Sequence, residues 1–203
     1  MNELTVQQLA DAYQDYFSVE HCISINAKAI SGALPDKAAL AAAIPPAFLL
    51  ASDAGGLNPS ALRSLHRLGD LAEELANYLQ QQARKIDMLL HYVLRQQDDA
   101  AQRFVTQSYG GSGCCYLADS PLKPLQIVEL KLFLDNNDGA VFCYGQVLSC
   151  EPQAEKWQIR VVFACIRDED RELIVRASLH QQSRLLKQKA EQKAELRQHT
   201  TPG

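Results

Sequence analysis

Several features that would place the chain in a familiar class are missing from its sequence. No apolar run approaches the about 20 residues that a helix needs to cross a bilayer. Met1 is not followed by the charged segment and apolar core of a secretory signal. We therefore expect a cytoplasmic protein without membrane insertion. The net charge of −4 over 203 residues provides no basic surface, so we expect no nucleic-acid partner.

Patterns of reactive and metal-binding residues are also scarce. The six cysteines are never spaced as CxxC and have no histidine at ligand spacing. We therefore predict no metal site and interpret the cysteines as small buried apolar residues. No Ser–His–Asp or Cys–His set stands out, and the acidic groups at 98–99 and 168–170 suit helix ends better than catalysis. We expect no enzyme and no cofactor.

One long helix, predicted over residues 58–97, is the strongest positive signal. Asn58 is a good N-cap residue, and Pro59 suits the first helical position. Two apolar positions then repeat every seven residues for about five heptads, which is the spacing of a coiled coil. The predicted self-association seam consists of Leu65, Leu68, Ala72, Leu75, Leu79, Gln82, Ile86, Leu89 and Val93, in which Gln82 is a polar break. The alternative is that this stripe packs on the protein's own core.

The remainder of the chain favours short strands. Residues 103–166 form alternating apolar segments separated by turns, which predict a small antiparallel barrel or sandwich. Another strand is predicted over 19–30, before the long helix, and a C-terminal helix over 168–197. Between them, Lys37–Ile44 is predicted to be helical, Pro45-Pro46 to end that helix, and 48–57 to be irregular. The expected fold class is therefore α+β.

Three runs in the strand-rich part resemble a PilZ domain. They are TQSYGGSGCCYLADSPLKPLQIVELKLFL, VFCYGQVLSC and WQIRVVFACIRDEDRELIVRASLHQQSRLL, which together span about residues 105–188. The resemblance implies a six-stranded antiparallel β-barrel followed by a C-terminal helix. It also implies a non-enzymatic role in signalling by the bacterial second messenger cyclic di-GMP.

The two anion-binding elements of a standard PilZ domain are altered here. Such domains bind cyclic di-GMP with an RxxxR loop and a D/N-x-S-x-x-G turn, whose arginines suit a planar, doubly anionic ligand. Alignment on Gly113 places Ser108 at the Asp/Asn position and Gly110 at the Ser position, while Arg95 and Arg103 stand alone. We predict that standard cyclic di-GMP binding is absent. The alternative is a receptor with a non-standard mode that uses these five residues or arginines of the C-terminal helix.

The sequence is also similar to a divergent PilZ subgroup that carries long heptad helices after the first barrel strand and assembles into tetramers. This resemblance implies one domain over residues 1–199. In it, 19–30 is a barrel strand and 33–100 is a helical insertion that contains the long helix. We therefore expect a homo-oligomer, with a tetramer favoured. The resemblance also implies contact with an unidentified regulatory protein in motility, pili or virulence.

Overall fold

We describe the fold from a computed structural model, which describes residues 6–14, 16–53, 70–135 and 138–199. In chain order, its helices and strands are α1 (Val6–Gln14), β1 (Ser18–Val19), β2 (Ser24–Ile30), α2 (Lys37–Ala43), α3 (Pro46–Asp53), α5 (Asp70–Gln96), the short 3-10 helix η2 (Ala100–Gln102), β3 (Arg103–Gly110), β4 (Gly113–Ala118), β5 (Ile127–Phe133), β6 (Ala140–Gln153), β7 (Lys156–Cys165) and α6 (Asp168–His199).

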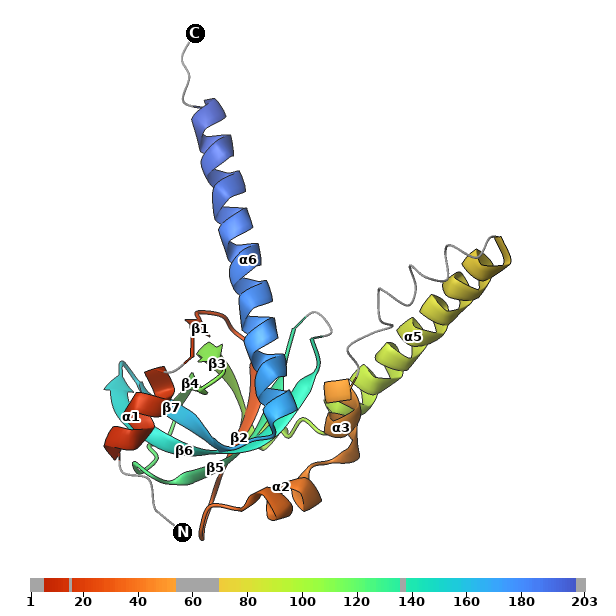
Figure 1. The fold of residues 1–203 in the computed structure, drawn as a ribbon. Coiled ribbons are helices and arrows are strands. Elements are labelled where there is room, and N and C mark those ends of the chain that lie inside the picture. The colour runs from red at the N-terminus through yellow and green to blue at the C-terminus, as the bar shows by residue number, and fades with distance from the viewer. Residues whose placement is uncertain (1–5, 15, 54–69, 136–137, 200–203) are drawn as a thin grey trace.

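The strands close into a six-stranded antiparallel barrel (Figure 1). The order around the barrel is β3-β2-β5-β6-β7-β4, and β4 returns to pair with β3, while β1 adds two residues beside β3. The predicted fold class, a small antiparallel barrel combined with helices, is confirmed. The alternating apolar pattern produces it because successive side chains of a strand point to opposite faces.

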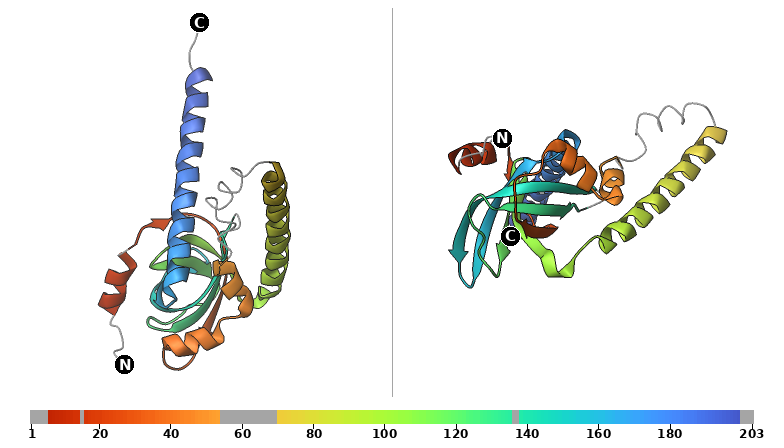
Figure 2. Two further views of the ribbon diagram at one scale, coloured as in Figure 1. Left: turned by 45° about the vertical axis from the view of Figure 1, so that its right-hand side comes forward. Right: turned by 90° about the horizontal axis from the view of Figure 1, so that it is seen from below.

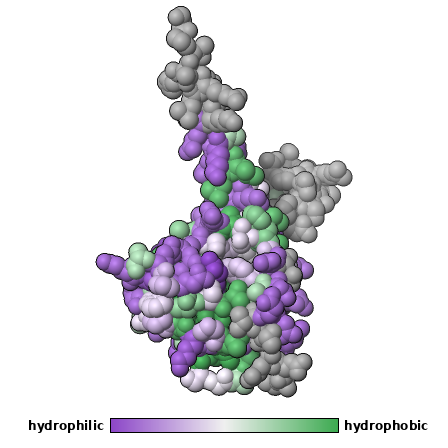
Figure 3. Space-filling model, turned by 90° about the vertical axis from the view of Figure 1, so that its left-hand side faces the viewer, coloured by the Kyte–Doolittle hydropathy of each residue, from purple (hydrophilic) through white to green (hydrophobic). Residues whose placement is uncertain are grey.

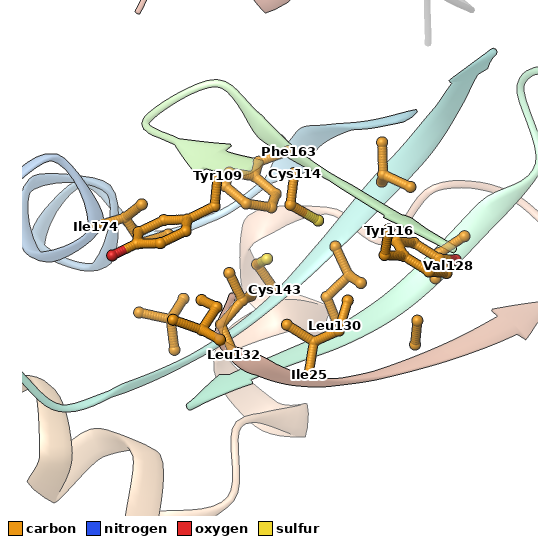
Figure 4. Close-up of a cluster of buried hydrophobic side chains, with 14 of the residues drawn as sticks. Ile25, Tyr109, Cys114, Tyr116, Val128, Leu130, Leu132, Cys143, Phe163 and Ile174 are labelled. Carbon is orange, nitrogen blue, oxygen red and sulfur yellow. The ribbon is translucent and has the colours of Figure 1, made fainter. Parts of the chain in front are cut away.

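Apolar side chains fill the interior of the barrel (Figure 4). Leu130, Cys143 and Phe163 enter it from three different strands and are buried. Helix α6 closes one end, where its Ile174 lies beside Tyr109. The first turns of α6 therefore belong to the barrel core, although the rest of that helix leaves the barrel.

Strand β2 is distant in sequence from the strands it pairs with. Ile25 lies opposite Phe104 of β3 and Leu132 of β5. The segment predicted as one strand over 19–30 forms two strands, β1 and β2. The side chain of Thr106 explains the break, because it accepts a hydrogen bond from the Ile23 amide (3.0 Å) and donates one to a carbonyl of the same segment (2.8 Å).

Helices α2 and α3, which follow β2, pack on the outer face of the barrel. Leu40 of α2 and Phe48 of α3 form a second buried cluster with Phe142 of β6. Helix α3 corrects one prediction, since 48–57 was expected to be irregular and Pro46–Asp53 is helical. Proline is compatible with the first helical turn, where its missing amide has no partner to lose.

Two long helices project from the barrel in different directions (Figures 1 and 2). Helix α5 has 27 residues and α6 has 32. At 1.5 Å per residue these lengths correspond to about 40 and 48 Å. Helix α5 lies within the predicted range 58–97, of which residues 58–69 are outside the described residues. Helix α6 matches the predicted C-terminal helix and extends two residues beyond it.

Candidate functional site

Helix α5 has apolar residues on two faces, and the described residues of the chain cover only one of them. Ala76 and Leu94 are buried, and Leu94 belongs to the cluster on the outside of the barrel. On the other face, the side chains of Ile86 and Leu89 are 63% and 66% exposed. Within the described residues, the predicted seam is therefore a different face from the one that packs on the barrel cluster.

The described members of the seam follow this division. Leu75, Ile86, Leu89 and Val93 are exposed, and Leu79 and Gln82 are half-buried. Leu65 and Leu68 lie outside the described residues, as does the side chain of Ala72. Residues separated by three or four positions share one stripe of a helix, so these side chains form a continuous row. Complete burial of one such leucine or isoleucine contributes about 1.5–3 kcal/mol, which makes the row a strong candidate for association.

Three further apolar residues of α5 are exposed outside the predicted seam, and two of them, Met88 and Tyr92, were missed by the sequence prediction. Tyr78, Met88 and Tyr92 are exposed to a similar degree as the seam. Tyr78 and Tyr92 flank the seam at heptad spacing, which was a usable signal. The two tyrosines make the exposed apolar face of α5 wider than a two-position seam, whereas Met88 points away from this face.

The arginines proposed as nucleotide ligands lie at the base of α5. Arg103 forms an ion pair with Asp98, with 2.7 Å between Nη2 and Oδ2, and Asn26 donates to the same carboxylate over 2.8 Å. Burial raises the pKa of Asp98, but the hydrogen bonds from Arg103 and Asn26 outweigh it and keep the pKa below its ordinary value. Arg95 lies in the last turn of α5 and is exposed. The guanidinium of Arg103 is thus already engaged by a carboxylate.

The glycine-rich turn lies at the opposite end of β3 from Arg103. Ser108 is five residues along this strand, which at about 3.3 Å per residue separates the two backbones by about 16 Å. The structure therefore groups Ser108, Gly110 and Gly113 with one another and places both arginines elsewhere. A Cβ atom on Gly110 would lie 2.2 Å from the Phe17 carbonyl oxygen, and one on Gly113 would lie 2.0 Å from that of Val161. These glycines allow close backbone packing.

The N-terminal segment of the chain covers this turn. Ser112 donates a hydrogen bond to the Tyr13 carbonyl (2.7 Å), and the Tyr13 side chain hydrogen-bonds Ser108. Burial raises the pKa of Tyr13 to about 12, so its hydroxyl is neutral. Arg171 of α6 donates to the Gly111 carbonyl and lies 5.5 Å over the ring of Tyr16. The space beside the turn is therefore occupied by the protein's own side chains, which no sequence pattern indicated.

A polar recess lies beside Ser108 on the outside of the barrel. Its volume is about 380 Å³, and it is lined by Glu20, Gln107, Ser108, Cys115, Gln158 and Arg160. Arg160 is the only cation among these lining residues, and it pairs with Glu151 at 3.2 Å. A site with one paired arginine and two nearby carboxylates is poorly suited to a doubly anionic ligand.

The described residues show no grouping typical of thiol or metal chemistry. Burial raises the pKa of Cys143 well above its ordinary value, so its thiol stays protonated and is a poor nucleophile. Among the described residues, no three potential His, Cys, Asp or Glu ligands gather around one point. In the same part of the chain, no helix combines the length and apolar character needed to cross a membrane.

Comparison with known proteins gives one family and several similar structures. The model of the PilZ domain matches residues 79–180, half of the chain. The chain is similar to a pathogenic protein from Xanthomonas campestris, described as a tetrameric PilZ domain self-assembled via an unusual helical bundle. The two share 15% identity with a TM-score of 0.53, over 86% of this chain and 90% of that one. At this identity the likeness shows the fold.

Two other structures overlap less. The Bacillus subtilis inhibitor of motility is 15% identical, with a TM-score of 0.37 over 40% of this chain and 42% of that chain. The PilZ domain of YcgR from Escherichia coli, solved with cyclic di-GMP, is 13% identical, with a TM-score of 0.35 over 48% of this chain and 83% of that chain. No curated protein matches the sequence.

Proposed function

Because the chain belongs to the PilZ domain family, we propose that it is a non-enzymatic bacterial regulatory protein of cyclic di-GMP-linked signalling. It assembles with copies of itself through α5 and acts through contacts with another regulatory protein, in motility, pili or virulence. Residues 1–199 work as one cytoplasmic unit in which the barrel carries the helical insertion. The observation that carries this proposal is the apolar row that α5 leaves exposed.

A second copy of the chain is the partner that best suits the row. A heptad-spaced seam is complementary to itself, because each apolar residue fits between residues of an equivalent helix. The additional exposure of Tyr78 and Tyr92 widens the apolar face, and a face wider than two heptad positions is typical of helices in bundles. Four copies are therefore favoured over two, as in the tetrameric protein from Xanthomonas campestris.

The surroundings of the glycine-rich turn support action through protein contacts instead of standard nucleotide binding. Tyr13 and Tyr16 occupy the space beside this turn, and Arg103 is paired with Asp98. A cyclic dinucleotide in the standard position would have to displace the tyrosines and would meet no free arginine pair. The absence of standard cyclic di-GMP binding is therefore part of the proposal.

Light scattering of the purified protein tests the assembly. The expected mass is four times the protomer mass of 22.5 kDa. Ile86→Asp should reduce it to that of a protomer, because the substitution places a charge in the seam at an already exposed position. Met88→Asp is the matched control, since Met88 is equally exposed but points more than a quarter turn away from the seam. A wild-type protein with the protomer mass would overturn the proposal.

A second candidate function is a receptor that binds cyclic di-GMP in a non-standard mode in the recess beside Ser108, where one arginine would have to outweigh two nearby carboxylates. Arg160 and Ser108 supply a cation and a hydroxyl to this recess. Calorimetric titration with cyclic di-GMP tests the idea. Binding to the wild-type protein that is lost in Arg160→Ala would favour this receptor over a regulatory protein that acts through protein contacts alone. The absence of heat at high micromolar ligand would remove it.

A further inference from the structure

A group of polar residues fixes the connector that joins α5 to β3. We name this group the connector clamp and define it as Asn26, Asp98, Asp99, Arg103 and Lys131. Its members come from the connector and from strands β2, β3 and β5. None of them belongs to the seam.

Asn26 is the centre of the clamp. It lies on β2 between Ile25 and Ala27, which face the barrel interior, so its own side chain points outward. Its exposed fraction is nevertheless only 4%, because the connector covers it. The amide nitrogen donates to Asp98 Oδ1 (2.8 Å) and to the Asp99 carbonyl (3.1 Å), and the amide oxygen accepts from the Asp99 amide (2.9 Å).

Two cations hold the connector from the neighbouring strands. Arg103 of β3 donates to Asp98 Oδ2 through Nε (2.8 Å) and Nη2 (2.7 Å). Lys131 of β5 donates to the Gln97 carbonyl (3.1 Å), immediately after the end of α5. A cation at a helix C-terminus is favourable because it satisfies a carbonyl that has no partner within the helix.

These contacts fix three consecutive residues, 97–99, to three strands of the barrel. One turn earlier, Leu94 is 5% exposed and anchors α5 on the outer apolar cluster. The buried Leu94 side chain and the hydrogen-bonded connector both hold α5. The helix cannot pivot without breaking the partly buried hydrogen bonds of Asn26, and a buried polar group left without a partner costs free energy. The junction is therefore a rigid joint and not a hinge.

We propose that the connector clamp fixes the direction in which α5 leaves the barrel, and that it thereby determines how the barrels are arranged around the helical assembly. Asn26, Asp98 and Arg103 are positioning residues for the assembly and make no contact across the seam. The part that concerns assembly rests on the proposed function of α5. The part that concerns the direction of α5 does not.

Spin-label distances test the direction of α5 separately from assembly. The labels are placed on cysteines introduced at Gln81 of α5 and Glu155 of the β6–β7 turn, both exposed, in a chain carrying Ile86→Asp and Cys22→Ser. Ile86→Asp keeps the protein monomeric, and Cys22→Ser removes the exposed thiol. A single narrow distance distribution is expected for this parent protein.

Asn26→Asp is the decisive variant, because it keeps the shape of the side chain and places a second carboxylate against Asp98. The distance distribution should broaden severalfold. Adding Asp98→Asn supplies an amide donor opposite the carboxylate introduced at position 26. The distance distribution should then become narrow again. Asn77→Asp, the same chemical change at an exposed position of α5, should leave the distribution unchanged. A narrow, unchanged distribution in folded Asn26→Asp would overturn the proposal.

If Asn26→Asp does not fold, Arg103→Gln is the second variant. The Arg103 side chain is half exposed, so its replacement should be tolerated, and it removes the ion pair with Asp98 from the clamp. It should also broaden the distribution, and an unchanged distribution would count against the clamp. The proposed function is tested by a different measurement, which is the mass of the wild-type protein in solution. A monomeric wild type with a broad Asn26→Asp distribution would refute assembly and retain the rigid joint.

Discussion

Helices α5 and α6 both project from the barrel, but they are built in opposite ways. Helix α6 buries the apolar residues of its base in the barrel, with Ile174 fully inaccessible, and its outer half is rich in Lys, Glu and Gln. Leu179 and Leu186 are exposed on α6, but polar residues such as Gln182 and Ser183 lie between them, and Figure 3 shows hydrophilic side chains beside apolar ones along this helix. Helix α5 instead exposes a continuous apolar row. A helix that projects from a barrel is therefore not by itself a sign of assembly. A row of exposed apolar side chains along the helix is the feature that supports it.

The largest expected effect comes from the buried base of α6. Ile174→Ala should reduce the free energy of unfolding by about 2–5 kcal/mol, because it leaves a cavity where α6 closes the barrel. Chemical denaturation measures the loss. Leu186→Ala on the same helix should stay within about 0.5 kcal/mol, as is usual for exposed positions. Equal losses in the two variants would mean that the base of α6 is not part of the core.

A pair of matched substitutions tests directly whether α5 and α6 differ in their contribution to assembly. Ile86 and Leu186 are 63% and 61% exposed, so an aspartate at either position costs the folded protomer little. Ile86→Asp should reduce the mass measured by light scattering to that of one protomer, whereas Leu186→Asp should leave it unchanged. Dissociation by Leu186→Asp would place α6 in the interface.

The connector clamp gives a smaller, pH-dependent effect. Asp98 has a lower pKa in the folded protein than its ordinary value of 3.8. Its contribution to stability is therefore fully present above 3.8 and is lost as the pH falls through the folded-state pKa. Wild type should be more stable than Asp98→Asn at pH 7, and urea denaturation should show that the difference shrinks below pH 4. A difference that grows with acidity would contradict the assigned role of this carboxylate.

Gln82→Leu should have the subtlest effect on α5. Gln82 is the polar member of the seam and is half-buried in the protomer. A single polar residue in such a seam specifies register and oligomer number at a cost in stability. Its replacement should strengthen association and shift or broaden the distribution of oligomers in native mass spectrometry. An unchanged distribution would show that Gln82 has no part in selecting the oligomer.

Local sequence patterns predicted the elements that depend on local periodicity. Strand β5, Ile127–Phe133, lies within the predicted strand-rich region 103–166, where Val128, Leu130 and Leu132 alternate with Glu129 and Lys131. A glycine within a strand is typical of a bulge or bend, and the register of β6 with β7 shifts between Tyr144 and Gly145. A Cβ atom at this position would lie 2.3 Å from Val161 Cγ1, which explains the glycine.

Features that depend on distant parts of the chain were not predictable in this way. The place of β2 between β3 and β5 is decided by residues about a hundred positions later, and only the family resemblance suggested it. Asn26 looked like an ordinary outward residue of an alternating strand, since nothing local shows that a connector 72 residues later covers it. The same holds for Tyr13, whose contact with the glycine-rich turn joins segments 99 residues apart.

The position of β2 also limits when the barrel can close during folding. This strand is synthesised before α5 but has no partner until β3 and β5 have followed it. Closing the barrel therefore waits for long-range pairing, which is slow compared with the formation of a helix. The seam of α5 leaves the ribosome earlier than every remaining barrel strand. If the proposed association through the seam holds, neighbouring nascent chains would expose their seams to one another before either has a finished barrel.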